Sequence, residues 1–330
     1  MKKLFLSLLI NSLFVFSANA RPLASEPGWE STISVNAGVV SSQSHLSFSD
    51  DDTIDSLNES ADSTTNVIAF PFARLQYTTK DLNTQFFLGN SREQISISQF
   101  QYELGVTHQF QNKTKFTVAY FPNLPLLNET WQDPYLVNQD RSETDKDAQG
   151  GRLELANLAG SPLTLKYAFA LTKIENDSSG EGIVSLSEQQ LQTLQRSSQY
   201  HRVTAEMMFP IRRGLLIRPG LQYTSRIADG DAVSYDDYDL QLGFLVFNGR
   251  HSTITTLNVG TTKYKQSNPI FDEKQNSLNM GIFSVYAYKQ PFDWESTTFT
   301  LIAGYNQKNS DITFHDESGL ILTTGLAYTF

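Results

Sequence analysis

Five histidines are the residues with the widest chemical range in this 330-residue chain, which contains no cysteine. A histidine base needs a nucleophile or a carboxylate within hydrogen-bond reach. His45 and Ser47 have a His-x-Ser spacing but begin an acidic loop, and His315 and Asp316 are neighbours that would point apart on an extended chain. The metal-binding spacings HxxxH and HExxH do not occur. The sequence therefore predicts no enzyme activity, no metal site and no cofactor.

Charged residues that alternate with apolar residues form a second set of candidates. In such a segment the charges share one face, and a charge facing lipid at mid-bilayer would cost roughly 2–4 kcal/mol. We therefore expect these side chains to face the inside of the protein. They either line a water-filled passage and contact solutes, or pair with one another and fill the interior. They are Glu103, Arg152, Glu154, Lys166, Arg202, Glu206, Arg218, Asp237 and Asp239.

The elements that would position these charges are strands of about ten residues. Between 100 and 110, apolar and aromatic residues alternate with polar ones, and the last twelve residues, 319 to 330, repeat the pattern. Successive side chains of a strand point to opposite faces, and about ten residues allow a tilted strand to cross a bilayer. Fourteen such segments, give or take two, can be placed along the chain.

The connections between these segments alternate in length. Those after even-numbered strands are short, and those after odd-numbered strands are longer, polar and often acidic. This alternation is typical of a closed meander whose ends lie on one side. The sequence predicts an all-β fold, a transmembrane up-and-down antiparallel β-barrel of about 14 strands with short periplasmic turns and long acidic outer loops. A secreted β-sandwich is the alternative, but its strands average about half this length.

Four local features are also expected. Pro71 cannot donate to a sheet and indicates a β-bulge, and Asn248-Gly249 favours a type I′ turn. Ser187 and Gln190 predict a capped helix near residues 188–196. That helix, or the long segment 121–149, would restrict the lumen. Residues 41–64 contain six acidic residues and no basic one, which predicts a solvated loop.

The N-terminus has the pattern of an export signal. Lys2 and Lys3 precede a short apolar run, and Ala18-Asn19-Ala20 follows it. This arrangement predicts a cleavable signal peptide at residues 1–20 and a single outer-membrane β-barrel domain at residues 21–330. The formal net charge of −10 argues against nucleic acid as a partner, because nucleic-acid binding requires a basic surface.

The C-terminal strand resembles the assembly signal of bacterial outer-membrane β-barrels, through Leu326, Tyr328 and the terminal Phe330. The mature chain resembles an uncharacterised family of proteobacterial outer-membrane proteins. Through Asn268-Pro269-Ile270-Phe271 it also shows a fainter likeness to the C-terminal barrel of surface lipoprotein assembly modifiers. These resemblances imply the bacterial outer membrane as the location. The implied partners are outer-membrane lipids, lipopolysaccharide and, through the C-terminal strand, the barrel-assembly machinery.

Three hypotheses about function follow from the sequence. The first is a passive or weakly selective channel for small solutes, based on the charged inner face. The second is a barrel for lipoprotein export or surface display, based on the fainter resemblance. The third is a closed scaffold whose outer loops bind an extracellular partner.

Overall fold

The computed structural model describes residues 23–47, 53–90, 102–123, 129–183 and 185–330. They form one closed antiparallel barrel, in which each strand pairs with the next and β16 pairs with β1. β9 and β10 pair with β11 in one register as far as Pro210, with an irregularity between Pro210 and Arg212, and together make one barrel strand. β6 pairs only with β7, outside the ring. Sixteen labelled strands therefore make a barrel of fourteen, which confirms the predicted fold class.

The strands are β1 (Gly28–Gln43), β2 (Thr64–Thr78), β3 (Thr84–Asn90), β4 (Tyr102–Gln109), β5 (Lys115–Phe121), β6 (Glu129–Trp131), β7 (Glu143–Ala156), β8 (Leu163–Ile174), β9 (Ser198–Met207), β10 (Phe209–Arg212), β11 (Leu215–Ala228), β12 (Tyr235–Asn248), β13 (His251–Tyr264), β14 (Ser277–Lys289), β15 (Thr297–Ser310) and β16 (Glu317–Thr329). The helical segments are η1 (Leu158–Gly160), α1 (Glu188–Gln192), η2 (Asp231–Val233), η3 (Pro291–Asp293) and η4 (Thr313–His315). Among the described residues, none of these helices has the length and apolar character needed to cross a membrane.

The outer face of the barrel is apolar and exposed. Val35 on β1 is 60% exposed, Leu221 on β11 is 64% exposed and Leu326 on β16 is 45% exposed. Their neighbours in sequence point inward and are small or polar, as the two-residue period of a strand requires. The wall therefore separates an apolar exterior from a polar interior.

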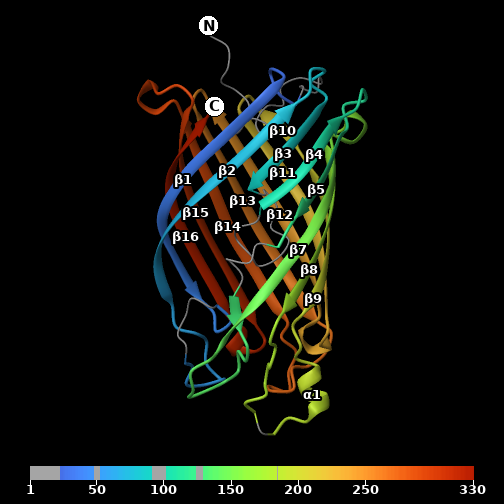
Figure 1. Cartoon of the computed structure of the whole chain (residues 1–330), viewed down its shortest axis with the longest axis vertical. Coiled ribbons are helices and arrows are strands. Elements are labelled where there is room, and N and C mark those ends of the chain that lie inside the picture. The colour runs from blue at the N-terminus through green and yellow to red at the C-terminus, as the bar shows by residue number, and fades with distance from the viewer. Residues whose placement is uncertain (1–22, 48–52, 91–101, 124–128, 184) are drawn as a thin grey trace.

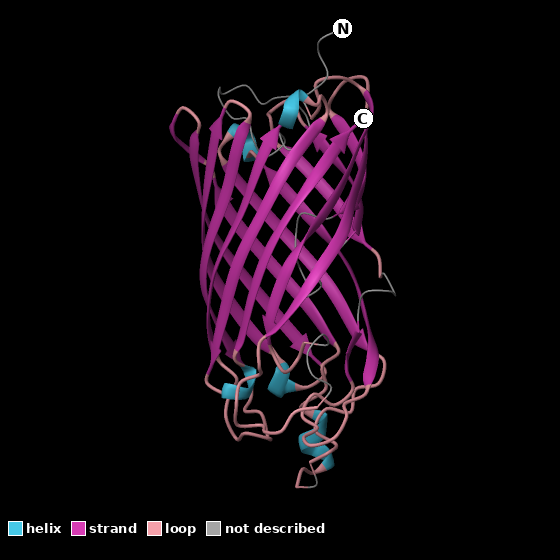
Figure 2. Cartoon of the chain, turned by 90° about the vertical axis from the view of Figure 1, so that its left-hand side faces the viewer, coloured by secondary structure: helices cyan, strands magenta, loops and turns pink. Residues whose placement is uncertain are grey.

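The two ends of the barrel differ. Figure 1 and Figure 2 show a tall barrel with the start of β1, the C-terminus and the short turns at one end. The long connections gather at the other end, near α1 (Figure 1). We call these the turn end and the loop end.

Several local predictions need correction. The register of β2 with β1 runs without a break through the Val35 and Pro71 pair, so there is no bulge in this described stretch. The pairing of β2 with β3 begins only at Arg74, so on that side the described sheet has no neighbour to which residue 71 would donate. The turn between β12 and β13 consists of Gly249 and Arg250, and only Gly249 has a positive φ, of 60°. Glycine at the first central position is typical of a type II′ turn rather than type I′.

Candidate functional site

A belt of charged side chains runs along the inner wall from β2 to β11. Glu103 is central to its first part: Oε1 lies 3.4 Å from Arg74 Nη1, and Oε2 lies 2.9 Å from Arg152 Nε. Arg152 Nη1 lies 2.9 Å from Glu154 Oε2. Glu154 is the direct cross-strand partner of Lys166. These pairings link side chains on β2, β4, β7 and β8, with β3 and β5 between them.

The second part of the belt centres on Glu206. Its Oε1 lies 3.3 Å from Lys166 Nζ and its Oε2 lies 3.7 Å from Arg218 Nε. Cations and anions therefore alternate around this arc, and each carboxylate lies between two cations. Opposite charges at this spacing largely cancel each other's field at a distance. We call the following residues the charged belt: Arg74, Glu103, Arg152, Glu154, Lys166, Glu206 and Arg218.

The arc from β12 to β1 has a different construction. On each pair of neighbouring strands an inward glycine lies directly opposite a larger side chain, which leans across it. A Cβ on Gly281 would lie 2.6 Å from Asn258 Oδ1, and one on Gly319 would lie 2.7 Å from Asn306 Oδ1. Without a Cβ, each glycine lets its partner lie along the wall instead of projecting inward. The pairs of this glycine wall are Asp239–Gly260, Asn258–Gly281, Phe283–Gly304, Asn306–Gly319 and Asn36–Gly325.

The ring of Phe283 indicates space inside the barrel. Its side chain leans over Gly304, which points inward, with ring atom Cδ2 2.8 Å from the position that a Cβ on this glycine would occupy. Phe283 nevertheless remains 45% exposed. An inward ring keeps such exposure only if room for solvent lies in front of it. The lumen is therefore not filled by side chains at this position.

The remaining predicted inner residues lie between the belt and the loop end. Asp237 Oδ1 accepts hydrogen bonds from Thr262 Oγ1 at 2.7 Å and Asn279 Nδ2 at 3.1 Å. Asp239 Oδ2 accepts one from Gln222 Nε2 at 3.2 Å, and Arg202 Nε donates to Thr224 Oγ1 at 3.1 Å. All nine predicted side chains thus lie on the wall face opposite the exposed apolar residues. Their contact with a solute remains a prediction.

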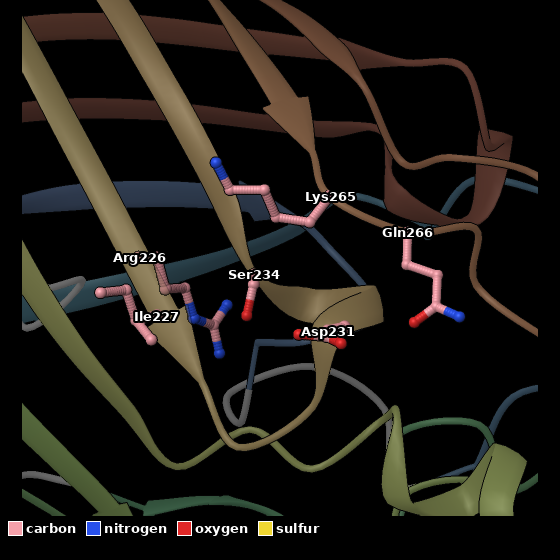
Figure 3. Close-up of a pocket in the computed structure, with 6 residues that line it drawn as sticks. All are labelled: Arg226, Ile227, Asp231, Ser234, Lys265 and Gln266. Carbon is pink, nitrogen blue, oxygen red and sulfur yellow. The ribbon is translucent and has the colours of Figure 1, made fainter.

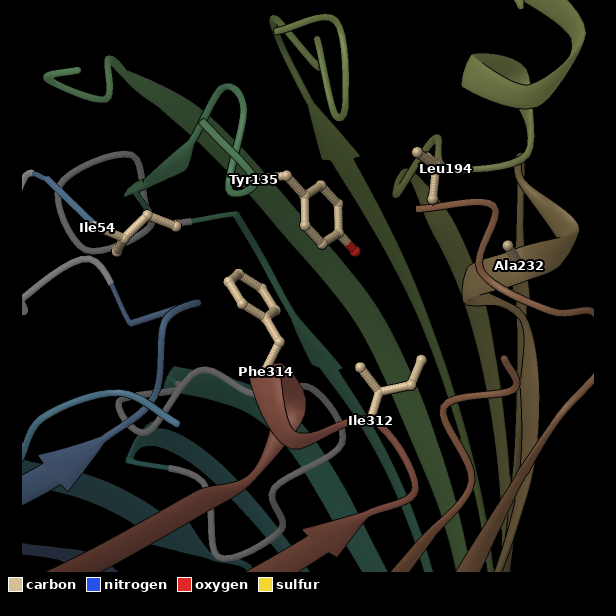
Figure 4. Close-up of a cluster of buried hydrophobic side chains, with 6 residues drawn as sticks. All are labelled: Ile54, Tyr135, Leu194, Ala232, Ile312 and Phe314. Carbon is tan, nitrogen blue, oxygen red and sulfur yellow. The ribbon is translucent and has the colours of Figure 1, made fainter. Parts of the chain in front are cut away.

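The loop end is covered by an apolar cluster, which we call the cap. Its buried core takes one or two residues from each of four long connections and one from the segment that follows α1. Figure 4 shows these side chains converging from different loops. Because the loops start from strands all around the rim, a cluster that joins them must lie across the mouth. The core consists of Ile54, Tyr135, Leu194, Ala232, Ile312 and Phe314, with Leu46, Leu57, Val137, Ile183, Leu186, Ile270 and Phe271 packed against it.

Tyr135 is the hub of the cap. Its ring centroid lies 5.4 Å from that of Phe314 and 6.1 Å from that of Phe271, so three connections meet at one ring. Its hydroxyl accepts a hydrogen bond from Asn268 Nδ2 at 3.2 Å. Burial raises the pKa of Tyr135 to about 12, so the hydroxyl stays neutral. This matters because an ionised group without a counter-charge would destabilise an apolar core.

Polar bonds between loops reinforce the packing. Arg141 Nη1 donates to the carbonyl of His45 at 2.7 Å, which ties the β5–β7 connection to the β1–β2 connection. Arg196 Nη2 donates to the carbonyl of Trp131 at 2.6 Å and forms an ion pair with Asp177. The cap is therefore a small folded unit rather than a set of independent solvated loops.

The structure changes the interpretation of three loop segments. Residues 41–64 were expected to be a solvated loop, but Ile54 within them is 6% exposed and belongs to the cap core. The segment 121–149 contributes Tyr135 to the cap, although its last part, from Glu143, is strand β7. The predicted capping box of Ser187 and Gln190 is confirmed. The helix is shorter than expected and buries no residue, whereas Leu194 beyond it does.

The histidines of the two motifs noted in the sequence, His45 and His315, both contact Phe314 of the cap. His45 stacks on Phe314 with ring centroids 4.5 Å apart. His315 is 2% exposed, and neither ring nitrogen has a hydrogen-bond partner among the described residues. Asp316 instead accepts a hydrogen bond from the backbone nitrogen of Ser310 at 2.7 Å. In the described part of the chain no group of three or more potential ligands could hold a metal ion.

Sequence reasoning missed the cap and the burial of His315. The available signal was the presence of apolar residues inside acidic loops, such as Ile54 and Leu57, and Phe314 beside His315. The stretch from Asn268 to Phe271, noted for its resemblance to another barrel, also lies in the cap: Asn268 is fully buried.

Comparison with known proteins identifies the family. The family described as "Protein of unknown function (DUF2860)" matches residues 28–329, from β1 to β16. The chain belongs to this family, in agreement with the resemblance to an uncharacterised family. No curated protein matches the sequence.

Several solved structures are similar in outline. The outer membrane channel DcaP of Acinetobacter baumannii has 7% identity and a TM-score of 0.45, over 92% of this chain and 96% of that one. The anion-selective porin from Comamonas acidovorans has 11% identity and a TM-score of 0.42, over 92% and 100%. The CymD monoaromatic hydrocarbon channel has 10% identity and a TM-score of 0.46, over 92% and 89%. No TM-score of the three reaches 0.5, so the fold assignment depends on the strand pairing itself.

Proposed function

We propose that the protein is an outer-membrane channel for small polar solutes, with weak ion selectivity and a cap that closes its outer mouth. The apolar exterior supports a position in a membrane. The export signal and the C-terminal strand support the outer membrane, with the loop end outside.

The observation that carries the proposal is the 45% exposure of the inward ring of Phe283. A barrel whose inner side chains paired across the lumen and filled it would bury this ring. The glycine wall supports the same conclusion, because it keeps amide and carboxylate side chains along the wall. A wall of this kind leaves a polar passage in a barrel that is wider than an eight-stranded one.

The charged belt supports weak selectivity. Its charges alternate in sign along one arc, so a passing ion meets attraction and repulsion at neighbouring positions. The opposite arc carries mostly amides, hydroxyls and glycines at its inner face, with the carboxylates of Asp237 and Asp239 on β12. Neither an anion nor a cation therefore gains a continuous path of opposite charge.

Planar-bilayer recording of the refolded protein tests the proposal. We expect conductance that is intermittent when the cap is intact and a reversal potential near zero in a salt gradient. Insertion of heat-modifiable, folded protein that never conducts, even in a variant without a stable cap, would overturn the channel assignment.

Charge reversal in the belt sharpens this test. Arg218 is 26% exposed at its side chain, so Arg218→Glu should fold and change the charge beside the lumen by two units. The reversal potential should then shift toward cation preference, and Arg152→Glu and Arg202→Glu should shift it in the same direction. Arg213→Glu makes the same change in an exposed turn and should shift it less.

A further inference from the structure

One apolar region interrupts the polar inner face, on the arc opposite the charged belt. Leu245 on β12 pairs directly with Ile254 on β13. The row continues through Val285 on β14 to Ile302 on β15. Three apolar side chains in the next row toward the loop end extend this surface to β1. We call the side chains that remain partly exposed the apolar track: Ile254, Val285, Ile302, Phe283, Ile321 and Val40.

The apolar track climbs along the wall. Ile254 lies three residues from the turn-end start of β13, and Val40 lies three residues from the loop-end finish of β1. Rows of cross-strand partners climb in this way because the strands of a barrel tilt by about 35–45°. Gly304 lets the surface continue between β14 and β16, because a Cβ there would lie 2.8 Å from Phe283 Cδ2 and 3.0 Å from Ile321 Cγ2. The track is therefore one continuous surface.

The position of the track indicates binding. Water-filled barrels usually present polar side chains to the lumen, and contiguous apolar surface that faces water commonly marks an interaction site. The ring of Phe283 is 45% exposed, so the space in front of the track is open. The apolar part of a solute would leave water by lying against this surface.

Arg218 supplies a cation at the edge of the track. It pairs across strands with Gly243, and a Cβ on that glycine would lie 3.4 Å from Arg218 Nε. The arginine side chain therefore leans over Gly243 toward β12. Gly243 and Leu245 share the inner face of β12, so the guanidinium lies beside the row that begins at Leu245.

The charge of Arg218 is only partly balanced. Its one ion pair with a described residue joins Nε to Glu206 Oε2 at 3.7 Å, and Glu206 is shared with Lys166 Nζ at 3.3 Å. The guanidinium makes no hydrogen bond to any described residue, and the side chain is partly exposed. A planar guanidinium of this kind can donate to both oxygens of a carboxylate.

The open pocket at the outer rim has a different lining. It has a volume of about 540 Å³, and Figure 3 shows Arg226 and Asp231 on either side of Ser234. Lys265 also lines it but is paired with Asp236. Arg226 and Asp231 then give the pocket one charge of each sign. The rim therefore favours neither anions nor cations, and the choice of solute falls to the lumen.

We propose that Arg218 and the apolar track form a binding site for small carboxylates that carry an apolar body. The carboxylate contacts Arg218, and the apolar body lies against Ile254, Val285 and Phe283. Gly243 and Phe283 lie two strands apart, about 10 Å at the usual strand spacing, which suits a ring on a short linker. The site rests on the proposed function for its role, which is to guide such solutes through the lumen; binding itself does not require conduction.

Isothermal titration calorimetry of the refolded protein tests the site, with phenylacetate as the probe and protein-free micelles as the blank. Acetate keeps the charge without the ring, and benzyl alcohol keeps the ring without the charge. We expect saturable heat with phenylacetate and an affinity about tenfold or more weaker for each half, because each half makes only one of the two contacts. Equal affinity for phenylacetate and either half, or no heat with phenylacetate, would overturn the site.

Substitutions in both parts of the site give a second test. Arg218→Gln removes the cation and should weaken phenylacetate binding about tenfold or more, whereas Arg218→Lys should weaken it less. Phe283→Ala and Val285→Thr reduce the apolar surface and should bring the affinity for phenylacetate closer to that for acetate. Arg213→Gln and Phe292→Ala change exposed residues in turns and are the matched controls. Native affinity in both Arg218→Gln and Phe283→Ala would contradict the site.

Bilayer recording separates the failure of this site from the failure of the channel. Protein that binds phenylacetate in the calorimeter but never conducts supports the site and contradicts the channel. Protein that conducts but does not bind phenylacetate supports the channel and contradicts the site. If Phe283→Ala fails to give folded, heat-modifiable protein, Val285→Thr and Arg218→Gln still decide the question.

Discussion

The barrel wall and the cap are stabilised by different interactions. The wall consists of backbone hydrogen bonds that continue around a closed ring, and its inner side chains pack mainly against their neighbours. The cap has few backbone ladders and depends on apolar burial around Tyr135. Wall and cap should therefore respond to different changes. The passage and its closure are then separable properties of one chain.

The largest expected effect is on the cap. Tyr135→Ala should destabilise it by about 3–5 kcal/mol, the usual cost of removing a buried aromatic side chain, while the barrel remains folded. The outer loops should become sensitive to protease in intact cells, and conductance should become steady. Phe292→Ala, at an 82% exposed ring in a turn, is the control and should change neither. Loops that stay resistant in Tyr135→Ala would mean that the cluster does not hold them together.

A change in the wall should destabilise the barrel and leave the cap intact. Glu103 is fully buried between two arginines, so Glu103→Gln removes the carboxylate that lies 3.4 Å from Arg74 and 2.9 Å from Arg152. The free energy of unfolding in urea should fall by about 2–3 kcal/mol, with the protease resistance of the loops unchanged. Glu154→Gln is a milder comparison, because this side chain is 24% exposed and contacts one arginine. Equal losses in the two variants would contradict a central role for Glu103.

Acid should act on the cap alone. Burial holds the pKa of His315 well below its ordinary 6.5, with the charge of Lys308 and, to a smaller extent, His45 acting in the same direction. The unfolded cap therefore takes up a proton below pH 6.5 while the folded cap does not. Cap stability should be constant above that pH and fall by up to about 1.4 kcal/mol per unit below it, until the folded pKa is reached. Hydrogen exchange of loop amides at pH 7 and pH 5 measures this, and His315→Phe should remove most of the difference.

The smallest expected effect concerns α1, which belongs to neither region. Ser187→Ala removes the side-chain bond to the nitrogen of Gln190 and should cost the helix about 1 kcal/mol. Since α1 buries no residue, conductance and loop protection should stay as in the native protein. Faster exchange restricted to the amides of 188–192 would support this, and an altered conductance would place the helix in the closure.

The face on which each wall side chain lies could be predicted from the sequence, because it depends only on neighbouring residues. Two-residue alternation, as between Leu104, Val106 and His108, places a side chain on one face whatever the rest of the chain does. For the same reason the face of each of the nine inner charges followed from its neighbours. The pairing of Glu103 with Arg152 could not be predicted, because it depends on register between strands that are 49 residues apart.

The cap could not be predicted for a related reason. Its loops carry no periodic pattern, and the acidic residues around Ile54 indicate solvation more strongly than one isoleucine indicates burial. Ile54 and Phe314 meet only because the closed barrel brings the first and last long connections together. The first part of β7 was not predicted for the same reason. Glu143, Asp145 and Asp147 resemble a loop in composition, yet they alternate in a strand that continues past the apolar zone.

The composition of the cap also sets an order for the folding of the chain. The cap needs Ile54 from the β1–β2 connection and Ile312 and Phe314 from the β15–β16 connection. These segments become neighbours only when β16 pairs with β1. A growing sheet with an unpaired edge therefore cannot complete this core, however much of the chain has already been laid down. The cap therefore forms only after the barrel has closed. The time at which loop amides become protected from exchange would report when β16 pairs with β1.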